Sequence, residues 1–215
     1  MANHGYVRNG LLVSLVFALA LVFDSANAQW TTVGSVNSAR SQVQQVYYNG
    51  YVYIFGGGGI PPGGSSYVAG MTAAQRISAD SGKVTDLAPM PNGRRGGYAG
   101  LVNGKIYLVG GNSPSAVVTQ VDIYDPATNS WTSGTPMPKG LLQISGATLG
   151  TNIYVMGGLT PSGTQYAYSQ STLVYDALTN AWTEINPAPY APDLGCATAA
   201  GGSIFLTGGR TSSGT

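Results

Sequence analysis

Residues 104–111 read GKIYLVGG, and closely similar stretches occur three more times in the 215-residue chain. They are GYVYIFGG at 50–57, TNIYVMGG at 151–158 and GGSIFLTGG at 201–209. In each of them a short apolar run follows a turn-forming pair and ends in two glycines. Such a run, bounded by turn residues, is typical of a strand buried on both faces. The chain therefore repeats one β unit.

The spacing of tryptophan and glycine gives the length of this unit. Trp30, Trp131 and Trp182 each precede the first glycine of a pair by 26 residues, and Val84 takes the same place before Gly110. Successive glycine pairs are 54, 47 and 51 residues apart. The stretch from tryptophan to glycine pair is thus constant, whereas the stretch that follows the glycines varies in length. A period of about 50 residues is typical of repeated β architectures.

Each unit carries the signals of four antiparallel strands. The turns NG, NG, GT and GG before the apolar runs suit two-residue hairpins, because glycine and asparagine accept a positive φ. VDIYDPATNSW at 121–131 and STLVYDALTNAW at 171–182 predict two more strands around an Asp-x-x-Thr-Asn turn. A four-stranded sheet that is apolar on both faces must stack on copies of itself. Radial stacking of such sheets gives an all-β fold, the β-propeller.

The glycine pairs and the aromatic residues receive structural roles in this prediction. Glycines without a side chain let the chain leave a crowded strand and approach its neighbour closely. Large flat side chains fill the wedge between sheets. The residues assigned these roles are Gly56, Gly57, Gly110, Gly111, Gly157, Gly158, Gly208, Gly209, Tyr124, Tyr175, Trp30, Trp131 and Trp182.

The order strand-Gly-Gly, then YDPATNSW at 124–131, then PMP at 136–138 resembles the kelch repeat. The resemblance implies a kelch-type β-propeller with blades at about 41–88, 95–136 and 142–187 and a partial blade at 193–209. Residues 29–36 would form an outer strand that closes the ring. About three and a half blades are present, and propellers have typically four to eight. We therefore expect the chain to be a fragment, or a truncated product, of a propeller with six or seven blades.

The first 28 residues are predicted to be a secretory signal peptide. LLVSLVFALALVF at 11–23 is an apolar run of 13 residues, too short for a spanning helix, and DSANA ends in a small-x-small pattern. Cleavage after Ala28 would leave a secreted or periplasmic protein with no stable membrane span; a retained membrane anchor is the alternative. Cys196, the only cysteine, lies in the apolar stretch LGCATAA and is expected to be a buried, inert thiol.

Composition and loop layout favour a binding module. The net charge is +1 and no Lys/Arg cluster occurs, which excludes nucleic acid as a partner. A constant scaffold with variable loops is a common layout of recognition surfaces, so we expect a protein or glycan partner at one rim of the propeller. Tolerated surface insertions are the alternative. The candidate rim residues are Arg40, Arg94, Arg95, Tyr67, Tyr166 and Tyr168. Arg94 and Arg95 together could clamp a carboxylate or stand as solvated charges.

Catalysis finds little support in these residues, and no cofactor or metal site is predicted. Exported kelch proteins include galactose-oxidase-like enzymes and sugar-acid mutarotases, so a fragment of such an enzyme, with its catalytic residues elsewhere, is the alternative function. Copper sites favour imidazole, and the only histidine is His4. Glu184, the only glutamate, is expected on an exposed outer strand, and Asp80, Asp125 and Asp176 in turns. The whole chain thus predicts an all-β, kelch-type, incomplete propeller that binds a partner.

Overall fold

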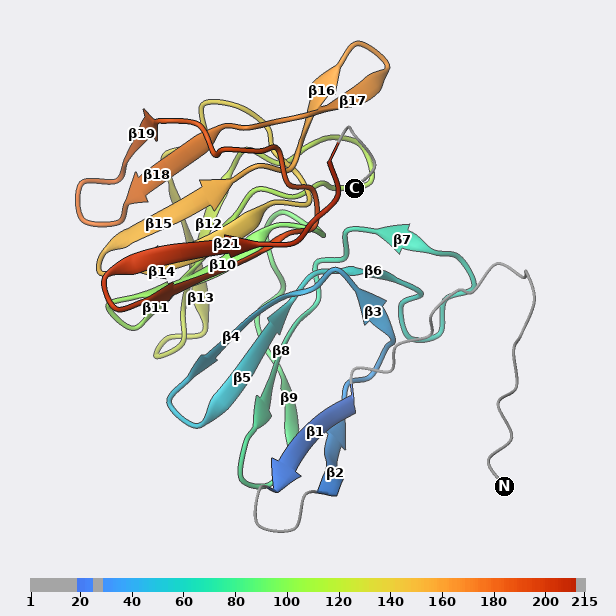
Figure 1. The fold of residues 1–215 in the computed structure, drawn as a ribbon. Coiled ribbons are helices and arrows are strands. Elements are labelled where there is room, and N and C mark those ends of the chain that lie inside the picture. The colour runs from blue at the N-terminus through green and yellow to red at the C-terminus, as the bar shows by residue number, and fades with distance from the viewer. Residues whose placement is uncertain (1–18, 25–28, 212–215) are drawn as a thin grey trace, which may run out of the picture.

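The computed structural model describes residues 19–24 and 29–211, and every regular element in them is a β-strand (Figure 1). Three four-stranded antiparallel sheets follow one another along the chain, and we number them as blades 1 to 3. Blade 1 consists of β4 (Gln44–Tyr48), β5 (Tyr51–Phe55), β8 (Ala74–Ser78) and β9 (Val84–Asp86). Blade 2 consists of β10 (Tyr98–Val102), β11 (Lys105–Val109), β12 (Val121–Asp125) and β13 (Ser130–Gly134). Blade 3 consists of β14 (Ser145–Leu149), β15 (Asn152–Met156), β18 (Thr172–Asp176) and β19 (Ala181–Ile185).

The sheets stack through their first strands, as expected of a propeller. Strand β4 lies next to β10, β10 next to β14, and β14 next to β20 (Cys196–Ala200). Strand β20 pairs with β21 (Ser203–Thr207), and the two form the last sheet of the described chain. The predicted fold class, an all-β and incomplete propeller of four-stranded antiparallel blades, is confirmed.

The hairpin turns that connect the first two strands of blades 1 and 2 have the predicted geometry; in the corresponding turn of blade 3, only Gly150 has a positive φ, of 61°. Asn49 and Gly50 have φ values of 48° and 80°, and Asn103 and Gly104 have 50° and 76°. Positive φ at both central residues matches the right-handed twist of the flanking strands. This match explains why the sequence repeats Asn-Gly at these positions.

The glycine pairs lie where three segments of backbone meet. The N–H of Gly57 donates to the carbonyl of Arg94, and that of Gly111 to the carbonyl of Leu141, so each pair is tied to the next blade. A Cβ at Gly111 would lie 2.5 Å from the carbonyl oxygen of Arg95, in the segment that enters its own blade. Any side chain would therefore push two connections apart. At Gly208, by contrast, a Cβ would meet nothing within 4 Å, so the close approach expected of the glycine pairs is absent there.

Aromatic side chains fill the space between blades. Between blades 1 and 2, the rings of Tyr124 and Trp131 are 4.9 Å apart, and Trp131 meets Phe55 edge-on at 5.6 Å. Between blades 2 and 3, Tyr175 and Trp182 repeat the arrangement at 5.0 Å. The Trp131 indole N–H donates to Ala88 at 2.9 Å and that of Trp182 to Thr135 at 2.8 Å, which anchors both rings to the preceding blade.

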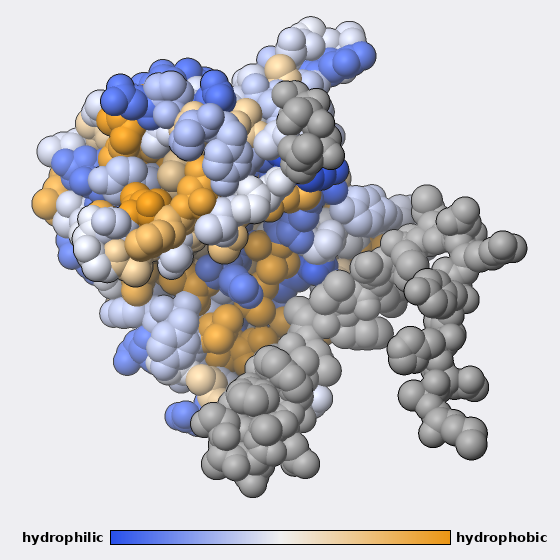
Figure 2. Space-filling view, viewed as in Figure 1, coloured by the Kyte–Doolittle hydropathy of each residue, from blue (hydrophilic) through white to orange (hydrophobic). Residues whose placement is uncertain are grey.

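The two ends of this row of sheets carry exposed apolar side chains. Figure 2 shows apolar surface over the β20–β21 hairpin and over blade 1. Phe205 on β21 is 54% exposed and Tyr47 on β4 is 62% exposed. Cys196, at the start of β20, is exposed as well, so the expectation of a buried thiol is wrong. Its strand belongs to the end sheet, and among the described residues no further sheet covers that face.

Residues 29–36, predicted to close the ring, contain β2 (Gln29–Ser35), which pairs with β1 (Leu19–Asp24). Within residues 19–24 and 29–211, β1 is the only strand that β2 pairs with. The side chain of Trp30 lies outside the described part of the chain. So do most residues of the predicted signal peptide, and its cleavage after Ala28 stays a prediction. No helix in the described ranges is long and apolar enough to cross a membrane.

Candidate functional site: the connection rim

The connections of variable length gather at one end of the propeller, which we call the connection rim. It consists of residues 39–43, 56–73, 93–97, 110–120, 141–144, 157–171, 192–195 and 208–211. Its short strands, at the right of Figure 1, were not predicted from the sequence. They are β3 (Arg40–Ser41), β6 (Gly58–Gly59), β7 (Val68–Ala69), β16 (Leu159–Ser162) and β17 (Gln165–Tyr168).

These connections are held to one another by their backbones. In every repeat the segment that enters the blade forms an antiparallel backbone pairing with the segment that follows the glycine pair. Strand β3 pairs with β6 in this way, and Leu142 pairs with Leu159. A chain of backbone hydrogen bonds then runs between repeats. The N–H of Gly96 donates to the carbonyl of Gln42, and the N–H of Gln143 donates to the carbonyl of Gly96. The N–H of Leu194 in turn donates to the carbonyl of Gln143. The rim is therefore a rigid frame from which side chains can project.

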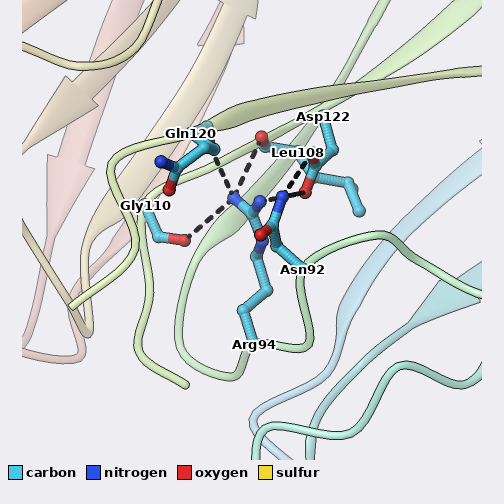
Figure 3. Close-up of polar contacts among 6 residues, drawn as sticks. All are labelled: Asn92, Arg94, Leu108, Gly110, Gln120 and Asp122. Carbon is cyan, nitrogen blue, oxygen red and sulfur yellow. Dashed lines mark hydrogen bonds and ion pairs between the residues drawn. The ribbon is translucent and has the colours of Figure 1, made fainter. Parts of the chain in front are cut away.

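Arg94 does not project from this frame. Its side chain is fully buried and points into blade 2, where the guanidinium forms an ion pair with Asp122 (Figure 3). Nη1 of Arg94 also donates to the carbonyl oxygens of Leu108, Gly110 and Gln120 at 3.2, 3.3 and 2.9 Å. Burial lowers the pKa of the Arg94 guanidinium, and the Asp122 carboxylate opposes that shift.

The carboxylate of Asp122 has a second donor, since Asn92 Nδ2 lies 3.0 Å from its Oδ1. The cluster in Figure 3 thus links the segment entering blade 2 to both central strands of that blade. It satisfies backbone carbonyls that would otherwise be buried without donors. The structure therefore places Arg94 in the interior, and the rim position expected of it is wrong.

Arg40 occupies the same place in blade 1 and is 3% exposed. It donates to the carbonyl oxygens of Gly56 at 3.0 Å and Ala73 at 3.2 Å, and Nη2 reaches Gln75 Oε1 at 2.5 Å. Gln75 in turn donates to Asp86 at 2.7 Å. Burial lowers the pKa of Arg40, and the charge of Asp86 raises it. Arg40 is likewise part of the interior and not of a binding surface.

Arg95 and Tyr67 are brought together on the rim. Nη1 of Arg95 donates to the hydroxyl of Tyr67 at 3.0 Å, although the two residues are 28 positions apart. Tyr67 is 53% exposed. The pair lies across Gly58, where any Cβ would collide with the phenol. Among the ion pairs of the described residues, none involves Arg95. The pair therefore offers guanidinium and phenol donors side by side at the surface.

Tyr166 and Tyr168 lie on the hairpin formed by β16 and β17, which projects from blade 3 at the top right of Figure 1. They are 53% and 37% exposed. Tyr166 pairs across the hairpin with Pro161, and Tyr168 with Leu159. Because cross-strand partners share a face, one side of this hairpin is a row of two tyrosines, a proline and a leucine.

The acidic residues have the structural places expected of them. Oδ1 of Asp125 accepts from the N–H of Ala127, and that of Asp176 from Leu178, as turn residues do. Glu184 lies on the outer strand β19 and pairs with Lys139 at 2.7 Å. Lys139, by this hydrogen bond, lowers the pKa of Glu184. In the described ranges, no three His, Cys, Asp or Glu side chains gather where they could share a metal ion.

Comparisons with known proteins agree with this architecture. The family model described as the KLHDC2/KLHL20/DRC7 kelch-repeats domain matches residues 5–209. Among solved structures, the chain is similar to that of YjhT, with a TM-score of 0.75 and 18% sequence identity. The match covers 88% of this chain and only 65% of the YjhT chain, and at such low identity it shows the fold alone. No curated protein matches the sequence. With a family model matched over most of its length and three kelch-type blades in its structure, the chain belongs to the kelch-repeat family.

Proposed function

We propose that this kelch domain is a non-catalytic scaffold that binds a protein or glycan partner through the connection rim. The observation that carries the proposal is the exposed Arg95–Tyr67 pair, whose donors stand on a backbone frame hydrogen-bonded from repeat to repeat. A rigid scaffold with exposed side chains on its connections is the usual arrangement of a recognition surface.

The chemistry of the rim suggests what it would recognise. Arginine and tyrosine are enriched at the centre of protein interfaces. A guanidinium without an acidic partner suits a carboxylate, and it binds one with two parallel hydrogen bonds. The hairpin with Tyr166 and Tyr168 adds flat rings on which an apolar side chain or a sugar face can stack.

The test is a binding screen of the full chain against a glycan array and a displayed peptide library, followed by variants. We expect ligands whose binding falls at least about tenfold in Arg95→Ala and in the double variant Tyr166→Ser/Tyr168→Ser, in line with interface hot spots. Leu178→Ser is the matched control, because Leu178 is 68% exposed but lies in the β18–β19 turn, outside the rim. Ligands that bind all variants equally would refute the rim as the binding surface.

Export remains part of this proposal. If the leader is removed after Ala28, the partner is met in the periplasm or the extracellular space. The intact mass of the protein, as exported by its own organism, tests cleavage directly. An N-terminus at Gln29 supports export, and an N-terminus at Met1 or Ala2 contradicts it.

A further inference from the structure

A small pocket lies between blades 1 and 2, at the end of the propeller opposite the connection rim. It has a volume of about 180 Å³ and is lined by the hairpin turns and by the strands that lead into them. The lining residues that matter here are Tyr48, Tyr51, Tyr53, Arg76, Gly104 and Pro126. None of them belongs to the rim of the proposed function, so this site is separate from it.

Strand pairing places the aromatic residues and the arginine on one face. Tyr48 is the partner of Tyr51 across the β4–β5 hairpin, and Tyr53 is the partner of Arg76 between β5 and β8. Tyr51 and Tyr53 are two residues apart on β5, so they point the same way. Their rings meet edge-on at 6.3 Å. All four side chains therefore face blade 2.

Arg76 is unusual for its position in the repeat. The corresponding residues of blades 2 and 3 are Ile123 and Val174, both apolar. The Arg76 guanidinium lies over the ring of Tyr51, 4.4 Å from its centroid, and its Nε is buried without a hydrogen-bond partner. No ion pair in the described ranges includes Arg76. A partly buried cation without a counter-charge is costly unless an anion joins it.

The nearest acidic turn is already occupied. Asp125, which precedes Pro126, accepts from the N–H of Ala127 and forms an ion pair with Lys105 at 3.7 Å. Gly104 leaves the mouth open on the blade 2 side, because a Cβ there would lie 3.0 Å from the Tyr48 hydroxyl. The pocket thus keeps free guanidinium donors and phenol groups around a space that fits one small ring.

We propose that this pocket binds a small ring compound that carries a carboxylate. The guanidinium of Arg76 holds the carboxylate, since arginine matches its geometry. The tyrosine rings stack on the ring of the ligand and their hydroxyls bond to its polar groups. Both a sugar acid and an aromatic acid have this chemistry, and the experiment separates the two.

The test titrates the full chain with glucuronate, benzoate and glucose. Binding is followed by calorimetry and by NMR signals of the arginine Nε–H groups and tyrosine rings. We expect a carboxylate probe to bind and to shift the Arg76 signal, and glucose to leave it unchanged. Preference for glucuronate identifies a sugar-acid site and preference for benzoate an aromatic-acid site. If neither probe moves the Arg76 or tyrosine signals, the proposal is overturned.

Variants taken from the repeat itself provide the controls. Arg76→Ile installs the residue of blade 2 and is expected to weaken binding at least about tenfold, as loss of a charge-assisted hydrogen bond does. Arg95→Ala, on the opposite rim, should bind the probe like the wild type. If Arg76→Ile does not fold, Tyr48→Val, again the blade 2 residue, replaces it with the same direction of change. Affinity within twofold of the wild type in the folded variant would refute the site.

Discussion

Blades 2 and 3 fill the same buried position in opposite ways. In blade 2 the position holds Arg94 and its partner Asp122; in blade 3 it holds Leu141 and Leu173. All four side chains are 0% exposed. One pair is an ion pair surrounded by backbone carbonyls, whereas the other belongs to an apolar cluster. The same position of the repeat therefore holds either a charged pair or an apolar pair, and both partners differ together between the two blades.

Blade 1 shows an intermediate arrangement. Arg40 is retained, but its partner is the neutral amide of Gln75, and the negative charge lies one step further, on Asp86. At this one buried position, blade 1 thus has an arginine with an amide, blade 2 an arginine with a carboxylate, and blade 3 a pair of leucines. Ion pairs buried in this way are often no more stable than a well-packed apolar pair of similar volume.

The central strands of blades 2 and 3 are joined differently. Strands β15 and β18 pair over five residues, from Asn152 to Met156, whereas β11 and β12 pair over three, from Ile106 to Leu108. Beyond that point Arg94 bridges the two strands, since it donates to Leu108 on one and to the Gln120 carbonyl before the other. At this end of the two strands the guanidinium supplies donors to the carbonyls of both, which gives Arg94 a structural task in place of a binding one.

The largest effect is expected from breaking only one half of the ion pair. Asp122→Leu leaves the Arg94 charge buried without its carboxylate and should lower the free energy of unfolding by about 3–5 kcal/mol. The double variant Arg94→Leu/Asp122→Leu copies blade 3 and should recover most of that loss. Denaturant unfolding of both variants and the wild type measures the difference. A single variant as stable as the wild type would show that the pair carries no such penalty.

The next effect is expected at the tryptophans that repeat between blades. Trp131→Ala should cost about 3–5 kcal/mol, because it removes a large ring packed on Tyr124 and Phe55. Trp182→Ala should cost about 1 kcal/mol less, since the repeat position of Phe55 is Val109 in blade 2 and one edge-on aromatic contact is missing. Unfolding midpoints compare the two directly. A larger loss at Trp182 would contradict the wedge interpretation.

Local rules of the chain account for what could be predicted. The turn at Asn103–Gly104 and the glycine pairs depend on backbone φ, and the place of Trp131 depends on a constant spacing. Each of these requirements is met within one repeat, so the sequence reveals it. The fold class and the aromatic wedge follow from such positions.

The direction of a side chain on the rim could not be predicted in the same way. Arg94 and Arg95 are adjacent and equally charged, yet one is fully buried and the other reaches Tyr67 at the surface. What decides between them is a partner 28 residues away, Asp122, on a strand position that is apolar in blade 3. The polar residues at this strand position, Gln75 in blade 1 and Asp122 in blade 2, were the available signal, because both occur in blades that carry the buried arginine. Burial of Cys196 likewise depends on a neighbouring sheet and not on its own strand.

The smallest change in stability is expected at a position where blades 2 and 3 carry the same residue, a buried tyrosine. Tyr124 and Tyr175 are both 1% exposed and donate to Asn129 and Asn180 at 2.7 and 2.5 Å. Burial raises the pKa of each tyrosine to about 12. In the unfolded chain a tyrosine has a pKa of about 10. Between these two values the unfolded state releases a proton that the folded state keeps. The stabilisation is therefore complete below pH 10 and is lost as the pH rises towards 12.

We expect Tyr124→Phe and Tyr175→Phe to flatten this alkaline loss of stability by similar amounts, because phenylalanine has no proton to release. Tyr166→Phe removes a hydroxyl at an exposed position and serves as the control. Unfolding midpoints measured from pH 9 to pH 12 provide the slopes. Equal slopes in blades 2 and 3 would show that their aromatic wedges are energetically alike although one blade encloses an ion pair and the other does not. A flattening in only one of them would mean that the charge of the Arg94–Asp122 pair reaches the wedge.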